Sequence, residues 1–308
     1  MNPTSKTPTP KGSAARSAGG ASRTPGTDLG SLGDRVWLVL GGGGLKGLSH
    51  IGAWRALGEA GVRVSGIVGT SVGALVGALA ASGVNWKEMR EHARALKRTD
   101  IVRVNRRAVL FNGIRQQSVF RGDTLREYYE RVLPAEGWGA VRIPLLVNAV
   151  DLATGKTEWF GTGARTDVTL VDALYASSAL PVLFPPAMIG GRAFVDGGTD
   201  HPLGLERAAL EGATGLLGVD VGAGQEGNAE QILRQGMITV HARIFAIMTY
   251  RRRRDLVTHW DGPPLLYVRP RLDGYGVFDF EHVEYFVEEG YRAMSLALGP
   301  GKRPPART

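Results

Sequence analysis

The sequence predicts a single α/β domain of three layers, in which helices cover both faces of a mostly parallel β-sheet. The continuous apolar run at residues 36–40 is typical of a strand buried on both faces, and residues 215–221 are predicted to be another buried strand. Glycine-rich turns lead from such runs into helical periodicity, and this alternation of strands and helices favours parallel pairing. Residues 34–299 contain no internal repeat and no linker, so one large core is expected.

The first half of the predicted domain repeats a strand–turn–helix pattern. The strand at residues 36–40 runs into the glycines at residues 41–44, and apolar residues then recur at helical spacing to about residue 60. A second strand at residues 64–68 meets a Gly-Thr-Ser-Val-Gly turn at residues 69–73, followed by an apolar helix to about residue 81. Residues 84–140 are more polar and are predicted to be largely helical.

The second half continues the alternation with shorter elements. Strands are predicted at residues 144–150, 157–160, 193–195, 215–221 and 265–268. Helices are predicted at residues 171–179, 203–210, 231–250 and 281–298. The order of these elements is that of one domain rather than two.

The two ends of the chain are predicted to lie outside this domain. Residues 1–33 consist mainly of Ser, Thr, Pro, Gly and Ala with scattered Lys and Arg, so they bury too little apolar surface to offset the entropy of ordering. We expect a disordered basic tail at residues 1–33, the folded domain at residues 34–299 and a flexible tail at residues 300–308. Without a signal peptide or a membrane-spanning run, the expected location is cytoplasmic, with or without peripheral membrane contact.

The net charge of +8 favours an anionic partner, either a phospholipid surface or nucleic acid. The chain has no motif typical of nucleic-acid recognition, so nucleic acid is not the expected partner. One run of basic residues offers a peripheral membrane contact of about 1 kcal/mol per residue. Its members are Arg251, Arg252, Arg253 and Arg254. The alternative for this run is a solvated helix end that complements the helix dipole.

Ser71 lies at the centre of Gly-Thr-Ser-Val-Gly, between a predicted strand and a predicted helix. Gly-X-Ser-X-Gly in this setting is a nucleophile elbow, a tight turn that exposes the serine hydroxyl. Gly69 and Gly73 leave room for the neighbouring chain, and the helix N-terminus favours developing negative charge. Ser71 is therefore the predicted nucleophile of acyl transfer, with an ordinary helix cap as the alternative.

The glycine-rich run at residues 41–47 admits two interpretations. Gly42, Gly43 and Gly44 bring backbone N–H groups close to an oxyanion, as ester hydrolysis requires. With Gly47 they also fit the dinucleotide fingerprint, which needs an acidic residue at the end of the second strand. That strand instead delivers Gly-Thr-Ser, which disfavours a nicotinamide or flavin cofactor.

A serine nucleophile needs a base to accept its proton. The six histidines of the chain lie in no motif typical of a triad partner. Asp196 follows a predicted strand and precedes Gly197 and Gly198, so it can reach the serine if the two strand ends are adjacent. On its own, Asp-Gly-Gly is a turn signal, and that alternative stays open.

Taken together, these motifs resemble the patatin-like phospholipases. Three of them occur in the family's order: Gly-Gly-Gly-Leu-Lys-Gly at residues 42–47, Gly-Thr-Ser-Val-Gly at 69–73 and Asp-Gly-Gly at 196–198. Three further segments, residues 71–79, 151–156 and 176–186, are similar to the family's elbow helix, its mid-domain turn and the stretch before its aspartate. The resemblance covers roughly residues 35–298.

The resemblance implies a patatin-like fold and a Ser–Asp dyad that works without a catalytic histidine. Ser71 would attack the ester carbonyl, Asp196 would accept its proton, and the N–H groups of residues 42–44 would hold the oxyanion. The implied activity is that of a phospholipase A or lysophospholipase that releases fatty acid from lipid acyl esters. One alternative is an esterase or acyltransferase acting on a different acyl donor. An alternative of another class is a nucleotide-binding or regulatory protein that uses the glycine-rich loop.

Two positions near the motifs raise further questions. His201 and Pro202 stand where many family members have Asn-Pro, and the place of His201 at the start of the next predicted helix disfavours a catalytic role. Lys46, inside the glycine-rich loop, is a candidate contact for a phospholipid phosphate or else a solvated lysine. The chain has no cysteine and no visible metal-ligating cluster, so neither a metal nor a cofactor is expected.

Overall fold

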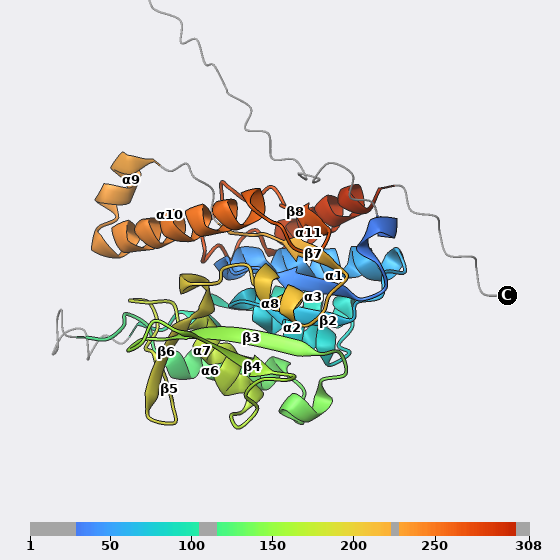
Figure 1. Ribbon diagram of the computed structural model, residues 1–308. Coiled ribbons are helices and arrows are strands. Elements are labelled where there is room, and N and C mark those ends of the chain that lie inside the picture. The colour runs from blue at the N-terminus through green and yellow to red at the C-terminus, as the bar shows by residue number, and fades with distance from the viewer. Residues whose placement is uncertain (1–28, 105–115, 223–227, 300–308) are drawn as a thin grey trace, which may run out of the picture.

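Eight strands form one mixed sheet in the computed structural model, which describes residues 29–104, 116–222 and 228–299 (Figure 1). The strands are β1 (Val36–Leu40), β2 (Gly66–Gly69), β3 (Leu145–Asp151), β4 (Thr157–Gly161), β5 (Ala187–Ile189), β6 (Arg192–Asp196), β7 (Gly215–Val219) and β8 (Leu265–Val268). Their order is β5-β6-β3-β2-β1-β7-β8, and β4 also pairs with β3. The strands from β3 to β8 along this order pair in parallel, whereas β4, β5 and β6 pair antiparallel.

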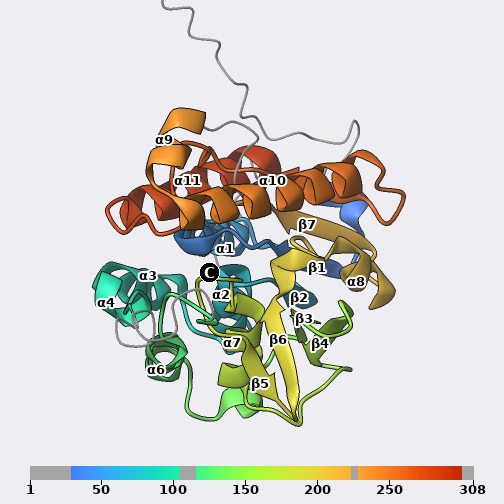
Figure 2. The ribbon, with the colours of Figure 1, turned by 90° about the vertical axis from the view of Figure 1, so that its left-hand side faces the viewer.

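Helices surround the sheet and connect its strands. The α-helices are α1 (Ser49–Glu59), α2 (Val72–Ala81), α3 (Trp86–Ala95), α4 (Arg98–Ile101), α6 (Gly122–Val132), α7 (Leu170–Ser178), α8 (Leu205–Leu210), α9 (Ala229–Arg234), α10 (Met237–Thr258) and α11 (Val283–Leu298). Short 3-10 turns are η1 (Leu29–Leu32), η2 (Gly44–Leu48), η4 (Gly137–Ala140) and η5 (Gly197–Thr199). The longest α-helix that the structure describes, α10, crosses above β1 and β7 in Figure 2, with α9 at one end.

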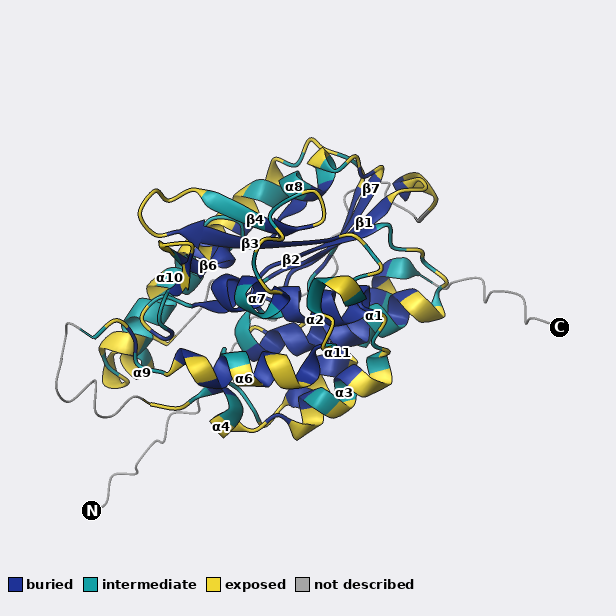
Figure 3. Ribbon diagram, turned by 90° about the horizontal axis from the view of Figure 1, so that it is seen from below, coloured by how far each residue is buried: buried dark blue, intermediate teal, exposed yellow. Residues whose placement is uncertain are grey.

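The core is divided by the sheet into two parts. Leu38 and Leu40 of β1 belong to the larger cluster, which contains residues of α1, α2, α6, α7 and α11. Trp37 and Val39 belong to the smaller cluster on the other face, with residues of α8. This alternation along one strand buries both faces, and Figure 3 shows the buried sheet between helices. The predicted three-layer α/β architecture with a mostly parallel sheet is therefore confirmed.

Three expectations about the elements are corrected. Residues 231–250 were predicted as one helix, but Gly236, at φ 85°, separates α9 from α10, and α10 continues to Thr258. The short edge strand β5 was not predicted, because three residues carry too little periodicity. The predicted tail at residues 1–33 ends too late, since η1 is formed and its Leu32 is fully buried against the sheet.

The remaining parts of the predicted tails, residues 1–28 and 300–308, lie outside the described residues. Within the part of the chain that the structure describes, no helix combines the length and the apolar character needed to cross a membrane.

Candidate active site

Ser71 occupies a sharp turn between β2 and α2. Its backbone has φ 55° and ψ −127°, a conformation that costs a non-glycine residue on the order of 1–3 kcal/mol. A Cβ on Gly73 would lie 2.3 Å from the carbonyl oxygen of Leu40, and one on Gly69 would lie 2.4 Å from the Cα of Ala74. Only glycine fits at both positions, so the spacing of the motif follows directly from the packing of this turn.

Hydrogen bonds to neighbouring segments hold this strained turn. The N–H of Ser71 donates to Oγ of Ser177 at 2.9 Å, and the N–H of Thr70 donates to the carbonyl of Leu40 at 3.0 Å. The Ser71 side chain makes no capping hydrogen bond to α2. It lines the same pocket as the carboxylate of Asp196.

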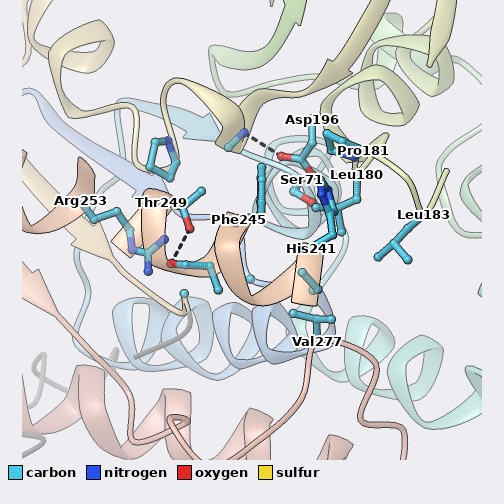
Figure 4. Close-up of a pocket in the computed structure, with 18 residues that line it drawn as sticks. Ser71, Leu180, Pro181, Leu183, Asp196, His241, Phe245, Thr249, Arg253 and Val277 are labelled. Atoms are coloured by element: carbon cyan, nitrogen blue, oxygen red, sulfur yellow. Dashed lines mark hydrogen bonds between the residues drawn. The ribbon is translucent and has the colours of Figure 1, made fainter. Parts of the chain in front are cut away.

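Asp196 ends strand β6 and points toward Ser71 in the pocket (Figure 4). Its carboxylate also accepts the N–H of Gly198 at 2.7 Å. Both side chains are buried, with 5% of Ser71 and 2% of Asp196 exposed. Burial raises the pKa of Asp196 to about 7, although the N–H of Gly198 and the nearby Ser71 hydroxyl oppose the shift. A carboxyl group with this pKa is suited to accept and return a proton near neutral pH.

The sheet register explains how the two residues meet. The strands that carry them are not adjacent, because β3 lies between β2 and β6. Val147 of β3 pairs with Gly69, and Ala149 of the same strand pairs with Asp196. Ser71 lies two residues beyond Gly69, just as Ala149 lies two residues beyond Val147. Strand β3 therefore places Ser71 and Asp196 at the same level along the strand direction.

Asn148 of β3, which the sequence analysis did not identify, supports the loop after Asp196. It is fully buried, and its Nδ2 donates to the carbonyl oxygens of Gly197 at 3.2 Å and His201 at 3.0 Å. A Cβ on Gly197 would lie 2.3 Å from Oδ1 of Asn148, which explains the first glycine of the Asp-Gly-Gly turn. Asparagine in a predicted buried strand was the available signal.

The glycine-rich loop lies beside the serine. A Cβ on Gly43 would lie 2.5 Å from the carbonyl oxygen of Val221, and one on Gly44 would lie 2.3 Å from that of Val277. The N–H of Gly42 already donates to the carbonyl of Pro202 at 3.3 Å. Among the described residues, the N–H groups of Gly43 and Gly44 have no hydrogen-bond acceptor. These two N–H groups therefore have no competing acceptor among the described residues, whereas that of Gly42 is already paired.

Gly47 and Gly198 also occupy tight positions. A Cβ on Gly47 would lie 2.9 Å from Cγ1 of Val72, at the start of the elbow helix. A Cβ on Gly198 would lie 2.9 Å from Oδ1 of Asp196. The first glycine packs the loop against the nucleophile turn, and the second leaves room for the carboxylate.

These groups open into a pocket that α10 closes from one side (Figure 4). The pocket holds about 670 Å³ of space, its mouth included. Most of its wall is apolar and comes from Leu180, Pro181, Leu183, Phe245 and Val277. His241 and Arg253 of α10 line it too, and the buried Nε2 of His241 has no hydrogen-bond partner among the described residues. Sequence analysis missed this contribution, because nothing in the pattern of α10 says which side of it faces the serine.

Two basic residues that were predicted to contact lipid headgroups are buried instead. Lys46 is 1% exposed and is not among the residues that line the pocket, so a contact with a headgroup there is not supported. Burial lowers its pKa to about 8. Arg253, expected as part of an exposed run, is 2% exposed and forms an ion pair with Asp220 at 2.9 Å. Neighbouring Arg251, Arg252 and Arg254 are exposed.

Histidine takes no part in the contacts of Ser71 and Asp196. His201, for which the sequence disfavoured a catalytic role, lies 3.4 Å from a carboxylate oxygen of Asp200 and 3.4 Å from one of Glu206. It is not among the residues that line the pocket. His50 is fully buried, bonds to the carbonyl of Gly41 at 2.8 Å, and has its pKa lowered to about 4 by burial. Within the described ranges, no three His, Cys, Asp or Glu side chains gather into a metal site.

Comparison with known proteins gives one consistent result. A family model described as patatin-like phospholipase matches residues 38–208, more than half of the chain. An uncharacterised NTE family protein of Mycobacterium tuberculosis is 32% identical over 200 residues, covering 65% of this chain and 52% of that protein. Lysophospholipase NTE1 of Phaeosphaeria nodorum is 27% identical over 292 residues, covering 84% of this chain and 18% of that protein.

Patatin-like phospholipase domain-containing protein 6 of Homo sapiens is 26% identical over 299 residues, covering 88% of this chain and 21% of that protein. The chain thus spans about half the length, or less, of these curated relatives. Among solved structures, VipD from Legionella pneumophila aligns with a TM-score of 0.46 and 15% identity, covering 87% of this chain and 67% of that chain.

Proposed function

The chain belongs to the patatin-like phospholipase family, and we propose that it hydrolyses lipid acyl esters through a Ser71–Asp196 dyad. The observation that carries the proposal is that Ser71 lies in one pocket with the buried carboxyl group of Asp196, whose pKa is raised to about 7 (Figure 4). A carboxylate in that state accepts the serine proton near neutral pH, so no histidine is needed. The proposed class is a serine carboxylic-ester hydrolase of the phospholipase A or lysophospholipase kind.

In the proposed first step, Oγ of Ser71 attacks the ester carbonyl while Asp196 accepts its proton. The carbonyl oxygen becomes negative and receives hydrogen bonds from the N–H groups of Gly43 and Gly44. The bond to the alcohol then breaks, and Asp196 returns the proton to the leaving oxygen. A water molecule, activated by the same carboxylate, attacks the acyl-enzyme and releases the fatty acid.

Two features of the site disfavour the other candidate functions. A capping serine would bond to the N–H groups of α2, and the Ser71 side chain makes no such bond. A dinucleotide site would also need an acidic residue after β2, where this chain has Thr70 and Ser71. An esterase or acyltransferase acting on a non-phospholipid donor uses the same groups, and the identity of the acyl donor is what distinguishes it.

Covalent labelling with a fluorophosphonate, together with fatty-acid release from phospholipid and triacylglycerol vesicles, tests the dyad. We expect the wild-type chain to be labelled and to release fatty acid, and Ser71→Ala to do neither while remaining folded. Ser82→Ala is the matched control, because Ser82 lies at the other end of α2 and its buried Oγ has no partner among the described residues. Near-normal release by Ser71→Ala would contradict the assignment.

We also propose that the outer face of α10 contacts a membrane surface. Ile244 and Met248 are 52% and 62% exposed, and Arg251 continues the same stripe at helical spacing. The opposite face of this helix lines the pocket through Phe245 and Arg253. A helix with this arrangement would bring the pocket against anionic lipid. A cytoplasmic location for such contact stays a prediction.

A further inference from the structure

Ser71 stands at the junction of two cavities. The first, here called the α10 cavity, is the pocket between the serine and α10 described above. The second, here called the α6 cavity, lies on the side of α2, α4 and α6. Four residues line both cavities: Gly44, Ser71, Leu180 and Val277. An ester bound at Ser71 therefore has two directions in which its substituents can extend.

The α6 cavity has the chemistry of a hydrocarbon site. The described residues that line it carry no charge, and its walls include Leu75, Ile101, Leu125, Tyr128 and Phe184. The hydroxyl of Tyr129, which also lines it, is satisfied by donating to Oγ of Ser178 at 2.8 Å. A polar or charged group entering this space would lose its hydration without new partners, whereas an acyl chain would be stabilised by burial.

The α10 cavity contains polar groups as well as apolar ones. Asp196, His241, Thr249 and Arg253 all line it, and none of them lines the α6 cavity. The buried Nε2 of His241 has no partner among the described residues, so it is available to a polar substituent of the substrate. The two cavities are thus chemically different, with the proton-transferring carboxylate on one side only.

We propose that the α6 cavity binds the acyl chain and that the α10 cavity binds the alcohol part of the ester. The proposal rests on the Ser71–Asp196 mechanism, because it follows from the path of one proton. Asp196 takes that proton from Ser71 and must give it to the leaving oxygen, so the alcohol lies on the side of Asp196. The acyl group is the other substituent of the carbonyl carbon and extends into the α6 cavity.

The step is balanced with the groups present. A bond forms between Oγ of Ser71 and the carbonyl carbon, and the bond between that carbon and the alcohol oxygen breaks. The proton that Asp196 accepted moves to this oxygen, and the alcohol leaves through the α10 cavity. Water then takes the vacated place beside Asp196, which leaves the acyl chain undisturbed in the α6 cavity until hydrolysis.

Two series of esters test the assignment on the full chain. The first varies the acyl chain from acetate through butyrate and octanoate to laurate, with p-nitrophenol as the constant alcohol. The second keeps butyrate constant and varies the alcohol from ethanol through benzyl alcohol to naphthylmethanol. The readout is the ratio of kcat/KM between the largest and the smallest member of each series, which cancels a general loss of active enzyme.

Leu125→Trp fills the α6 cavity, and Ala246→Phe, a matched enlargement, fills the α10 cavity. We expect Leu125→Trp to lower the laurate-to-acetate ratio by about tenfold or more, since space for one or more methylenes is lost. Ala246→Phe should lower the naphthylmethyl-to-ethyl ratio and change the acyl ratio much less. Leu125→Ala should raise the laurate-to-acetate ratio, which covers the case in which the tryptophan variant does not fold.

The opposite pattern, in which the α10 substitution changes acyl preference and the α6 substitutions change alcohol preference, would overturn the proposal. Equal effects of both substitutions on both series would overturn it as well. Failure of the proposed function looks different, because the wild-type chain would then hydrolyse no ester of either series and its Ser71 would not react with fluorophosphonate. In that case the assignment of the two cavities falls with the mechanism on which it rests.

Discussion

At the scale of single residues, the proposed chemistry of this site depends on one buried carboxyl group. Asp196 has lost its hydration, and the hydrogen bond it accepts from Gly198, with the nearby Ser71 hydroxyl, only partly compensates. The folded protein therefore holds a proton on this group up to a pH of about 7, although an exposed aspartate releases it near its usual pKa of 3.8. As pH rises through this pKa, catalytic activity is expected to increase and the stability of the folded protein is expected to decrease.

For catalysis, the carboxylate must be ionised to accept the serine proton. We expect kcat/KM for a soluble ester to rise with pH through a pKa of about 7 and to level off above it. Asp196→Asn should lower kcat by at least about 10³-fold, because the amide cannot accept the proton. A rate profile with its lower limb near pH 4 would contradict the assignment of Asp196 as the base.

The same group should make the folded protein less stable as pH rises. Because the folded-state pKa lies above the unfolded-state value, the stabilisation is fully present below pH 3.8 and is lost as pH rises through about 7. Asp196→Asn removes this loss, so its Tm relative to wild type should increase between pH 5 and pH 8. A rise of the pKa from 3.8 to about 7 changes the free energy of unfolding by at most on the order of 4 kcal/mol.

At the scale of elements, buried ion pairs position α10 over the pocket. Asp220, directly after β7, is 1% exposed and pairs with Arg253 of α10 at 2.9 Å and with Arg269 at 3.1 Å. It also accepts the hydroxyl of Tyr267 at 2.6 Å, and these positive and polar partners hold its pKa down to about 2 despite burial. The ion pair between Asp220 and Arg253 thus joins the end of β7 to α10 at the edge of the site.

Removing the α10 partner leaves the carboxylate of Asp220 with less compensation. We expect Arg253→Met to lower the free energy of unfolding by about 3 kcal/mol, the lower end of the range for breaking a buried pair, because Arg269 remains. Arg252→Met is the matched control, since the Arg252 side chain is 51% exposed and its nearest carboxylate oxygen lies 3.9 Å away. Equal Tm values for the two variants would contradict the role given to Arg253.

The elements themselves were largely predictable from local patterns. Strand β1 and helix α2 begin and end where the sequence places them, because a continuous apolar run and a glycine-bounded helix are strong local signals. Helix α10 was predicted with other bounds and without its orientation, since it combines a face that lines the pocket with an exposed apolar face and so lacks a simple amphipathic pattern. Its break from α9 depends on a left-handed conformation at Gly236, which the sequence permits but does not require.

At the scale of the whole molecule, the pocket and the proposed membrane-contacting face of α10 lie on opposite sides of one helix. Exposed apolar side chains beside basic ones are suited to an anionic lipid surface. Arg63, in contrast, precedes β2 and lies at the end of the sheet opposite Ser71. Only the surface formed by α10 is therefore proposed to contact lipid, and the end of the sheet near Arg63 is not.

Sedimentation with anionic vesicles of phosphatidylcholine and phosphatidylglycerol tests this surface. Arg251→Glu should weaken vesicle binding by about fivefold or more, since each basic residue near an anionic surface contributes about 1 kcal/mol. Arg63→Glu makes the same change in net charge away from the proposed surface and should have a much smaller effect. Equal losses for both variants would indicate a dependence on net charge alone and would contradict a contact through α10.

The sequence by itself determined the class of fold and named the residues of the proposed dyad. It could do so because the requirements of a nucleophile elbow and of tight backbone approach are local, and each is met by glycine at fixed spacing. It also identified Asp196 as a candidate, but only on the condition that its strand lies near that of the serine. That condition is a matter of strand order, which no local pattern contains.

Only the tertiary structure decided what surrounds the dyad. Strand β3 sets Ser71 and Asp196 at one height through pairings between segments far apart in the chain. Packing of α10 brings His241 and Arg253 to the pocket and buries one arginine of a run that is otherwise exposed. Burial, and with it the raised pKa of Asp196, arises when distant elements exclude water together, and for this reason these properties could not be read from the sequence alone.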